Sequence, residues 1–526
     1  MLPPLARTLP DLLRENAGLR GEQVAVIAGD RQATYSALHA RAQAVAAGLR
    51  GLGIGHGDRV GMIVSNRVEW LEICFGATLA GAVAVPFSTW STAKELAFLL
   101  VDSKVKVLFT LASFGENDFV AALRANAPEG LRIFLVGEGE GFDPFAAFGA
   151  EPDGEQLAPG EGAGAGDDAL ILYTSGSTSA PKGVRMKHHG IIENGFNIGE
   201  RQGLTADDRV FLSAPLFWSY GSANALSATF THGATLVLQE KFEPAGALDL
   251  IERHRCTSVY TLPAMTNAMV RTPEFRRERT ASLRTGLTIG GSQDVLAAVE
   301  TLGVPEICNI YGATETYGNC CVTHHDWPIE RKLASQGLPL PGQELRFRDE
   351  ETGEIVASGQ PGLVEVRGYV TPGYTGVSSE LNAEAFTEDG FYKTGDIGRL
   401  DENGGFVFIG RSTEMIKRAG INVSPAEIEE VLLQHPAVVR TAVVGVPDAR
   451  RGEAIVAYVV PADHGAARVD ALVAHCADAL SKYKIPDHFE FIDALPLTPT
   501  GKLMRKELKQ AAIAAYSQAM PAGRAS

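Results

Sequence analysis

The chain has 526 residues, which is too long for one ordinary hydrophobic core, so we expect two or three domains. Hydrophobic residues make up 45% of it and charged residues 21%, as in globular proteins. The formal net charge of −16 argues against a nucleic-acid partner, because binding a polyanion requires a basic face. Any anionic ligand must therefore be held by local positive groups.

The N-terminal stretch MLPPLARTLPDLL lacks the basic start and unbroken apolar core of a signal peptide. No apolar run approaches the ~18 residues that a membrane helix requires. The six cysteines show no metal-ligand spacing, and we interpret the adjacent Cys320 and Cys321 as buried thiols rather than a redox pair. These features predict a cytoplasmic protein without an integral membrane segment.

The first part of the chain alternates strand and helix patterns. Residues 58–64 and 81–87 are predicted strands, and residues 69–81 and 93–103 are predicted helices. Such alternation favours a parallel sheet with helical crossovers. The Gly-, Glu-, Asp- and Pro-rich segment 137–168 predicts a surface loop.

The pattern of predicted elements changes twice in the second half of the chain. Further buried strands are predicted at 211–217, 234–239, 257–263 and 284–291. Residues 350–400 contain short strands and turns, followed by a hairpin turn at 402–405. Beyond Arg411 the pattern indicates a small α+β domain, with helices at 425–435 and 469–484 and strands at 441–448 and 454–461.

The segment YTSGSTSAPKGV, residues 173–184, follows an apolar run and has the composition of a phosphate-binding loop. It is not a Walker A loop, because Lys182 is preceded by Pro181 and followed by Gly183. Its hydroxyls, Gly176, the backbone N–H groups of a tight turn and the Lys182 ammonium could still hold an anion. Ser/Gly/Thr loops are also common linkers, so this segment alone leaves both interpretations open.

Four further segments carry candidate ligand-binding groups. YGATET (311–316) follows an apolar strand and offers the Glu315 carboxylate for Mg²⁺. YKTGD (392–396) places Asp396 where a carboxylate could bind ribose hydroxyls. GRSTEMIKRAGINVSPAEIE (410–429) carries Arg411 and Lys417, and PLTPTGKLMRKEL (496–508) carries Lys502 in a turn. Each segment taken alone also fits an ordinary surface turn or strand end.

Together, in this order, the five motifs resemble those of the adenylate-forming superfamily, and most closely the AMP-dependent acyl-CoA synthetases. The resemblance covers nearly the whole chain. It implies an α/β fold in which a large N-terminal domain (1–411) of parallel αβαβα-type sheets with a distorted β-barrel precedes a small, mobile α+β domain (412–526). The phosphate loop departs from the family pattern at Ser179, where glycine is usual.

The resemblance implies an ATP-dependent reaction in which a carboxylate attacks the α-phosphate and pyrophosphate leaves. Lys502 would bridge the two anions, since their approach needs local positive charge. Glu315 and Thr314 would assist the metal and the α-phosphate, and Tyr311 would stack on adenine. The implied nucleotide-binding positions are Thr174, Ser175, Gly176, Ser177, Thr178, Lys182, Asn309, Tyr311, Gly312, Asp396 and Arg411.

In the second half-reaction implied by the resemblance, the thiol of coenzyme A attacks the adenylate and AMP leaves. The small domain would rotate between the two halves, removing Lys502 and bringing in the face from Lys417 to Gly420. The hinge position is Thr413, where the family more often has Asp or Lys. A hinge requires only a residue that can absorb a φ/ψ change, so threonine is tolerable there.

The acid-binding pocket is predicted by position on the segments 215–226 and 288–292, together with Ala313, Tyr317 and Gly318. Trp218 stands where many relatives carry His or another aromatic residue, and it could either shorten the pocket or pack in the core. No Asp occurs between Val210 and Gln239 to pair with an ammonium group, so amino acids are disfavoured. The predicted pocket residues are Trp218, Tyr220, Gly221, Gly290, Gly291, Ala313, Tyr317 and Gly318.

The sequence analysis therefore predicts an acid–CoA ligase that uses ATP, Mg²⁺ and coenzyme A and takes an apolar acid, a fatty acid in preference to an aryl acid. Three alternatives stay open: an acyl-AMP ligase that loads a carrier protein, a luciferase-like oxidase, and a catalytically inactive nucleotide-binding protein. The expected partners are small molecules and no nucleic acid, and the sequence is compatible with a homodimer.

Overall fold

The computed structural model describes residues 2–148, 162–174, 181–418, 421–448, 451–462, 467–497 and 503–519. The chain divides into two compact units. The first comprises residues 1–290, 294–345 and 366–393, and the second comprises 291–293, 346–365 and 394–526. The functional boundary between residues 411 and 412 stays a prediction.

One sheet of the first unit has eight strands and is mainly parallel. Its strands, in spatial order, are β21 (Tyr374–Thr375), β11 (Lys182–Lys187), β10 (Asp168–Thr174), β4 (Val83–Pro86), β3 (Arg59–Ile63), β5 (Val107–Leu111), β8 (Arg132–Val136) and β9 (Asp143–Pro144). The predicted strands 58–64 and 81–87 are thereby confirmed as β3 and β4. The strands β21 and β10 both pair antiparallel with β11, so the end of the sheet that carries the candidate phosphate loop is a small antiparallel meander.

A second sheet of the first unit has nine strands. Its strands, in spatial order, are β18 (Leu338–Pro339), β17 (Cys321–Val322), β16 (Glu306–Tyr311), β15 (Thr285–Thr288), β14 (Ser258–Tyr260), β12 (Arg209–Leu212), β13 (Thr235–Leu238), β1 (Val24–Ala28) and β2 (Arg31–Thr34). The strands from β16 to β1 pair in parallel, as helical crossovers require. A separate two-stranded hairpin consists of β6 (Ser113–Phe114) and β7 (Asn117–Asp118).

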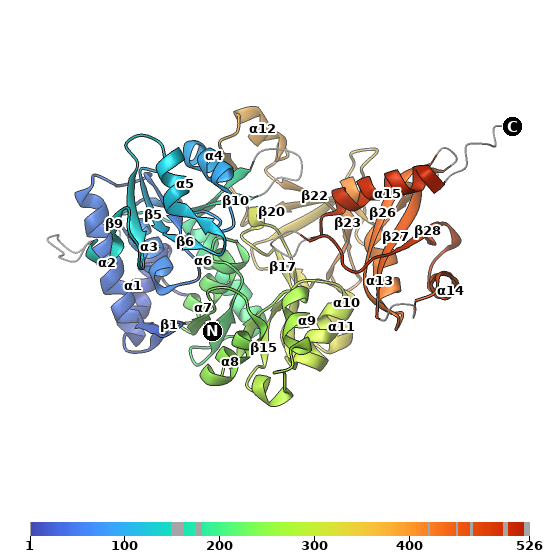
Figure 1. Cartoon of the computed structure of the whole chain (residues 1–526), viewed down its shortest axis with the longest axis horizontal. Helices are drawn as coiled ribbons and strands as arrows, with labels where there is room; N and C mark the ends of the chain where they lie inside the picture. Colours follow the sequence, from blue (N-terminus) through green and yellow to red (C-terminus); the bar gives the residue numbers. More distant parts are fainter. Residues whose placement is uncertain are drawn as a thin grey trace. The chain divides into compact units, whose positions relative to one another are not determined.

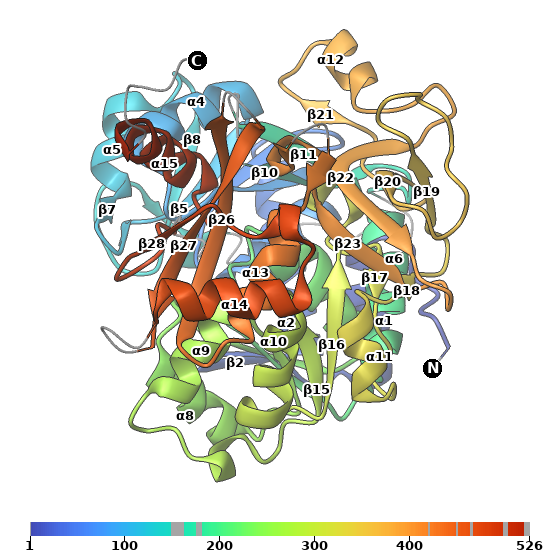
Figure 2. The same ribbon diagram turned by 90° about the vertical axis from the view of Figure 1, so that its right-hand side faces the viewer.

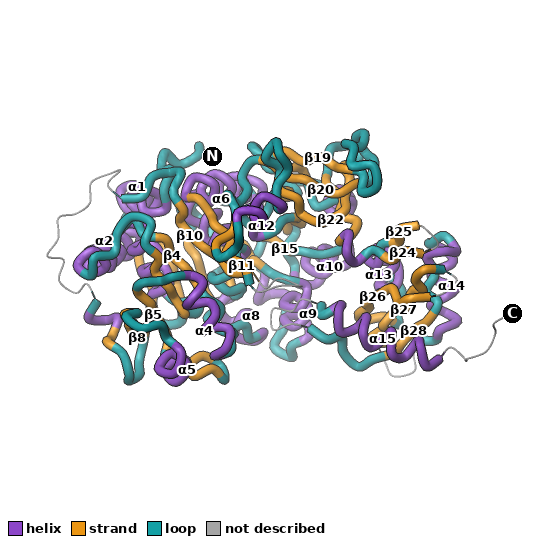
Figure 3. The backbone as a smooth tube through the Cα atoms, turned by 90° about the horizontal axis from the view of Figure 1, so that it is seen from above, coloured by secondary structure: helices purple, strands orange, loops and turns teal. Residues whose placement is uncertain are grey.

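Helices cover both sheets of the first unit (Figure 1). They are α1 (Leu9–Arg20), α2 (Tyr35–Gly51), α3 (Val68–Leu79), α4 (Ala93–Ser103), α5 (Phe119–Asn126), α6 (His188–Gln202), α7 (Ser227–Thr231), α8 (Pro244–His254), α9 (Pro263–Arg271), α10 (Ser292–Leu296), α11 (Ile329–Ala334) and α12 (Ser379–Glu384). Shorter helical turns are η1 (Phe145–Ala147), η2 (Tyr220–Leu226), η3 (Arg277–Thr280), η4 (Ala297–Leu302) and η5 (Thr314–Thr316). Figure 3 shows α1 and α6 on one side of β4 and β10, and α4 and α5 on the other.

The helix predicted over residues 93–103 is α4, and its ends follow from local chemistry. Thr92 and Glu95 form a capping box, in which the Thr92 side chain accepts from the Glu95 N–H and the Glu95 carboxylate accepts from the Thr92 N–H. Lys104 ends the helix with a positive φ of 54°. Leu96, Leu99 and Leu100 bury one face of this helix.

The segment 137–168 departs from the predicted surface loop at its start. Phe145 and Phe148 are buried, and their ring centroids lie 5.4 and 5.2 Å from that of Phe109 on β5. The Arg41 guanidinium lies 4.6 Å from the centroid of the Phe145 ring. This part of the segment therefore belongs to the core, because burying two phenylalanine rings outweighs the turn-forming composition around them.

The second unit includes a four-stranded sheet in the region where short strands and turns were expected. Its order is β19 (Glu344–Arg348), β20 (Gly362–Arg367), β22 (Tyr392–Leu400) and β23 (Phe406–Arg411). The division between the units falls within the first three of these strands. The predicted hairpin turn is confirmed, since Leu400 pairs with Phe406 and the Asp401 N–H donates to the Gly405 carbonyl.

The C-terminal part of the second unit is a small α+β fold (Figure 2). Its strands are β24 (Ile416–Arg418), β25 (Ile421–Val423), β26 (Val438–Asp448), β27 (Gly452–Pro461) and β28 (His488–Phe491). Its helices are α13 (Pro425–Leu433), α14 (Val469–Ala479) and α15 (Arg505–Ala519), with short turns η6 (Ser412–Glu414) and η7 (Lys482–Lys484). Successive residues of β26 point to opposite faces, so Val443 packs with Ile428 and Leu472 while Val444 packs with Leu508 of α15.

One predicted helix of this unit is too long. The pattern predicted a helix over residues 469–484, but α14 ends at Ala479. Leu480 is extended and buried in the core, and its N–H donates to the Cys476 carbonyl at 2.7 Å. The helix ends there because an extended Leu480 reaches the core, which outweighs the helix preference of the following residues.

The large α/β part followed by a small C-terminal α+β part confirms the expected fold class. All six cysteines are buried and none forms a disulfide, which confirms the interpretation of Cys320 and Cys321 as buried thiols. Among the residues that the structure describes, no helix combines the length and apolar character that crossing a bilayer requires.

Candidate active site

The candidate phosphate loop joins the ends of the hairpin β10–β11. Thr174, the last residue of β10, pairs in register with Lys182, the first residue of β11. The loop between them, residues 175–180, lies outside the described residues. The same holds for the predicted positions Ser175, Gly176, Ser177 and Thr178 and for the departure at Ser179.

Two of the predicted charged groups contact one aromatic side chain, Tyr374 of β21, one at its ring and the other at its hydroxyl. The Nζ atom of Lys182 lies 5.3 Å from the centroid of the Tyr374 ring. The Tyr374 hydroxyl donates to Oε1 of Glu315 at 3.0 Å. The structure therefore brings the lysine of the phosphate loop and the predicted metal-binding carboxylate to the same place.

The Glu315 segment is held by bonds on both sides. Its carbonyl accepts from the Thr371 N–H at 2.7 Å. The Thr314 hydroxyl lies 3.1 Å from that of Ser219, which connects the segment to the predicted acid pocket. Before it, a Cβ on Gly312 would lie 2.5 Å from the Asn319 Cα, so only glycine allows this close approach of the backbone.

The strands β15 and β16 end side by side at this site. Asn309 is buried near the end of β16, and its side-chain amide donates to the Gly290 carbonyl at 3.2 Å. Tyr311, the last residue of β16, is also buried. Ligands of α/β sheets bind beyond the carboxyl ends of parallel strands. Asn309, Tyr311, Gly290 and Gly291 all lie at such ends.

The predicted acid-pocket segment forms an aromatic cluster with a residue that sequence reasoning missed. Trp218 is half-buried, and its ring centroid lies 5.2 Å from that of Trp90 at an interplanar angle of 79°. Phe217 packs edge-on against Trp90 at 5.3 Å. Tyr220 is buried, and its hydroxyl lies 3.0 Å from both the Thr261 and Leu287 carbonyls. The neighbouring Gly221 is also buried, in the turn η2.

Ala313, Tyr317 and Gly318 flank the Glu315 turn. Tyr317 adopts a φ of 57°, is almost completely buried, and accepts a hydrogen bond from the Lys187 N–H at 2.8 Å. Burial raises the pKa of Tyr317, so its phenol stays neutral. The turn at residues 313–318 is therefore fixed from both ends.

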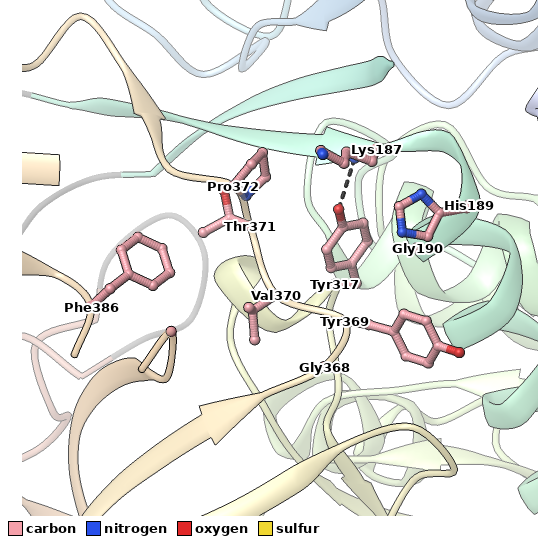
Figure 4. A pocket seen from close by; sticks show the side chains of 11 residues that line it. Lys187, His189, Gly190, Tyr317, Gly368, Tyr369, Val370, Thr371, Pro372 and Phe386 are labelled. Carbon is pink, nitrogen blue, oxygen red and sulfur yellow. Dashed lines mark hydrogen bonds between the residues drawn. The ribbon is translucent and has the colours of Figure 1, made fainter. Parts of the chain in front are cut away.

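Tyr317 also lines a cavity of about 330 Å³ in the first unit (Figure 4). The other residues around this cavity come mainly from the start of α6 and the segment between β20 and β21, and they include Lys187, His189 and Tyr369. The cavity does not include Trp218, Tyr220 or Gly290. We therefore do not equate it with the predicted acid pocket.

The second unit holds the remaining described candidates. Asp396 on β22 is buried and pairs with Arg411 on β23, with Nε of Arg411 3.1 Å from Oδ1 of Asp396. The predicted hinge residue Thr413 lies in the short turn η6. Lys417 on β24 has an exposed side chain, and its N–H donates to Glu453 at 2.7 Å. Gly420 and Lys502 lie outside the described residues.

No functional signal for Tyr374 or Trp90 is visible in the sequence. Tyr374 lies in PGYTG, which has the composition of a turn, and its contacts depend on pairing with a distant strand. Trp90 follows β4 in the segment FSTWST, and nothing local indicates that its indole meets Trp218. An observable signal existed only in the rarity of tryptophan, of which the chain has four.

Comparisons with known proteins show the family of this chain. Residues 13–375 match the model of the AMP-binding enzyme family, and residues 427–502 match that of the AMP-binding enzyme C-terminal domain. The chain is 34% identical to a feruloyl-CoA synthase of Amycolatopsis sp over 92% of this chain and 95% of that protein. It is 30% identical to the mitochondrial medium-chain acyl-CoA ligase ACSF2 of Mus musculus, over 93% of this chain and 84% of that protein.

Among solved structures, the chain is similar to ATP-bound MatB from Rhodopseudomonas palustris, with a TM-score of 0.86 and 28% identity. The similarity covers 96% of this chain and 99% of MatB. The two-part fold, the ordered motifs and these relatives lead to one conclusion. This chain belongs to the AMP-binding, adenylate-forming enzyme superfamily and is an AMP-forming acyl-CoA ligase.

Proposed function

We propose that this ligase activates an apolar carboxylic acid as an acyl-adenylate and transfers the acyl group to coenzyme A, with a fatty acid as the first candidate substrate and an aryl acid as the alternative. The observation that carries the proposal is the meeting of Lys182 and Glu315 at Tyr374. A cation at the mouth of a phosphate loop and a carboxylate beside it are the groups that an ATP-dependent adenylation requires.

The preference for an apolar acid rests on the surroundings of the predicted pocket. Its described side chains near Trp218 are aromatic, and the segment 210–239 contains no carboxylate. A substrate ammonium group would be left there without a partner, which is energetically costly. One relative is a feruloyl-CoA synthase and another is a medium-chain acyl-CoA ligase, and the assay with a panel of acids distinguishes these two substrate classes.

The donor set around Glu315 fits Mg²⁺. Among the described residues no cluster of three or more His, Cys, Asp or Glu side chains could hold a metal ion alone. Mg²⁺ is commonly held by one or two carboxylates together with substrate phosphates, and Glu315 offers one carboxylate beside the phosphate loop. When bound, the ion would supply positive charge next to the phosphate oxygens.

In the first half-reaction, an oxygen of the substrate carboxylate attacks the α-phosphorus of ATP. The bond from that phosphorus to the oxygen bridging the β-phosphate breaks, and pyrophosphate leaves. Lys502 would lie between the carboxylate and the α-phosphate and reduce the repulsion between these anions. The loop from Thr174 to Lys182 would hold the outer phosphates and Thr314 would assist the α-phosphate. Tyr311 would stack on adenine.

Asp396 and Arg411 are the proposed ribose-binding pair. In the second half-reaction, the thiol sulfur of coenzyme A attacks the acyl carbonyl carbon, and the bond from that carbon to the phosphate oxygen breaks. AMP leaves and the thiol proton passes to solvent. The face from Lys417 to Gly420 would admit the thiol arm, and Thr413 would be the hinge between the two states.

An assay of pyrophosphate release with a panel of acids, each with and without coenzyme A, tests the proposal. We expect release with medium- or long-chain fatty acids and a thioester product only when coenzyme A is present. Release with aryl acids alone would replace the fatty-acid assignment. Release without a coenzyme A-dependent thioester would instead favour the loading of a carrier protein, and no release with any acid would contradict the proposed activity.

The variant Lys502→Ala separates the two half-reactions. We expect adenylate formation to fall by about 10³-fold, because the repulsion between the two anions is no longer offset. Thioester formation from supplied acyl-AMP and coenzyme A should stay within about twofold of the wild type, since this lysine acts only in the first half. Equal loss of both half-reactions would contradict the proposed role of Lys502.

A further inference from the structure

The short strand β21 brings Tyr374 into contact with both charged groups of the proposed phosphate site. Its hydroxyl donates to the Glu315 carboxylate at 3.0 Å, and the face of its ring lies 5.3 Å from the Lys182 ammonium. The Tyr392 hydroxyl lies 3.5 Å from the same phenol oxygen. One side chain therefore contacts the two groups on which the proposed function depends.

The backbone of β21 is fixed, which fixes the position of the ring. Tyr374 pairs with Val184, and Thr375 with Gly183, both on β11. A Cβ on Gly183 would lie only 2.3 Å from the Thr375 side chain, so the two strands approach as closely as they do because residue 183 is glycine. Asn382 of α12 also holds the backbone of Tyr374.

The Asn382 side chain bonds both backbone groups of Tyr374. Its Oδ1 accepts from the Tyr374 N–H at 2.7 Å, and its amide donates to the Tyr374 carbonyl at 3.1 Å. A backbone held by a paired strand and by two hydrogen bonds from one side chain has little freedom to move, and the hydroxyl bond to Glu315 orients the ring. Tyr374 therefore offers its hydroxyl and its ring face at set positions.

A tyrosine phenol is neutral at pH 7, and here it donates its hydrogen to the Glu315 carboxylate at 3.0 Å. Within the described residues, Lys182 and Glu315 form no ion pair with each other. A neutral phenol contacts each of them instead, by a hydrogen bond on one side and a cation–π contact on the other.

The absence of an ion pair between Lys182 and Glu315 in this part of the described structure affects how both groups can bind ligands. If the Lys182 ammonium paired directly with Glu315, the ammonium would be less available to phosphate and the carboxylate less available to a metal ion. A phenol between them attracts both groups without cancelling either charge. Resting on the proposed function, we infer that Tyr374 is a positioning residue of the phosphate site, which holds Lys182 and Glu315 apart and oriented for MgATP.

Two variants of Tyr374 separate its two contacts. Tyr374→Phe keeps the ring under Lys182 and removes the hydroxyl bond to Glu315. Tyr374→Leu removes both contacts and leaves Lys182 free to pair with Glu315. Tyr369→Phe is the matched control, because the Tyr369 hydroxyl also donates to a carboxylate, that of Glu193, and lies in the segment just before β21.

For Tyr374→Phe we expect the Mg²⁺ concentration at half-maximal pyrophosphate release to rise about tenfold, the loss expected for a hydrogen bond to a charged group. The KM for ATP at saturating Mg²⁺ should stay within about threefold of the wild type. For Tyr374→Leu we expect the Mg²⁺ requirement to rise in the same way, and the KM for ATP at saturating Mg²⁺ to rise about tenfold. Thioester formation from supplied acyl-AMP should be unchanged in both, which a general structural defect would not permit.

Calorimetric binding of a non-hydrolysable ATP analogue tests the inference independently of activity. Tyr374→Phe should bind the analogue about tenfold more weakly than the wild type in Mg²⁺ but equally well in EDTA. Tyr374→Leu should bind it more weakly in both. Wild-type affinity of both variants in Mg²⁺, or the same losses in Tyr369→Phe, would overturn the inference.

This binding measurement keeps the two proposals distinguishable. If the wild type releases no pyrophosphate with any acid, the proposed function fails. The comparison of analogue binding in Mg²⁺ and EDTA would still decide whether Tyr374 positions Glu315 and Lys182.

Discussion

The two units place their candidate charged groups in opposite ways. In the first unit, Lys182 and Glu315 are both held by a neutral phenol, that of Tyr374. In the second unit, Asp396 and Arg411 bond directly to each other, with 3.1 Å between Oδ1 and Nε. Charged groups that are not paired with each other remain available to a ligand. A ligand of Asp396 and Arg411 must instead share the hydrogen-bonding atoms of this ion pair or separate the two side chains.

This difference suits the two ligands that we propose. Phosphates and a metal ion carry full charges, which separated groups of the protein can meet directly. Ribose hydroxyls are neutral and can add to the outer atoms of an intact carboxylate–guanidinium pair. The comparison therefore predicts that changing a charge in the first unit costs more activity than changing one in the second.

Within this comparison, the largest expected effect is that of Glu315→Gln. The substitution keeps the size of the side chain and an acceptor for Tyr374 but removes the charge. We expect kcat/KM for pyrophosphate release to fall by about 10²–10³-fold, because the negative charge that would attract a bound metal ion is removed.

Glu193→Gln is the control for this prediction. Its carboxylate also accepts a tyrosine hydroxyl, that of Tyr369, but we assign it no role in nucleotide binding. Activity of this variant should stay within about twofold of the wild type. Similar losses in both variants would remove the distinction that we draw for Glu315.

A smaller effect is expected for Asp396→Asn. The amide oxygen can still accept from a ribose hydroxyl, so we expect the KM for ATP to rise about tenfold with a smaller change in kcat. Steady-state kinetics with ATP varied would measure this. The double variant with Arg411→Gln should be less impaired than the sum of the single effects, because the two side chains act as a pair. Additive effects would contradict the pairing in the working enzyme.

A third way of placing an ionisable group is expected to affect folding stability. His188, the first residue of α6, is completely buried, and its Nδ1 accepts from the Leu9 N–H at 3.1 Å. Burial lowers the pKa of His188 from 6.5 to about 3, so the ring is neutral when the protein is folded. Unlike the two sites above, this position excludes charge altogether.

Because its folded pKa is depressed, His188 contributes stability that is present above pH 6.5 and is lost as the pH falls towards 3. The variant His188→Asn keeps an acceptor for Leu9 but does not titrate. Chemical denaturation of both proteins should show that the wild type loses about 1.4 kcal/mol more than the variant per pH unit below pH 6. Parallel pH profiles would contradict this assignment.

Local chemistry made part of this fold predictable. The helix 93–103 was predictable because Thr92 and Glu95 cap it and leucines line one face. The buried position of Phe145 and Phe148 was not, because the rings lie in a Gly- and Pro-rich segment and their partner Phe109 is distant in sequence. The end of α14 before Leu480 was not predictable for the same reason, since the core that Leu480 enters is formed by other elements.

The candidate site shows the same limit. Ordered motifs predicted Lys182, Glu315, Asp396 and Arg411 as candidates, because their chemistry is visible in the sequence. Tyr374 was missed because its role arises only when β21 pairs with β11. Long-range strand pairing is what a single sequence reveals least.

The pairing of β21 with β11 has a further consequence, for solubility. In the spatial order of the eight-stranded sheet, β21 is the outermost strand next to the six residues of β11. An uncovered strand of that length offers a row of backbone groups on which a second molecule could assemble, whereas the two residues of β21 offer almost none. Detachment of β21 would therefore be expected to promote self-association through the hairpin that carries the proposed phosphate loop.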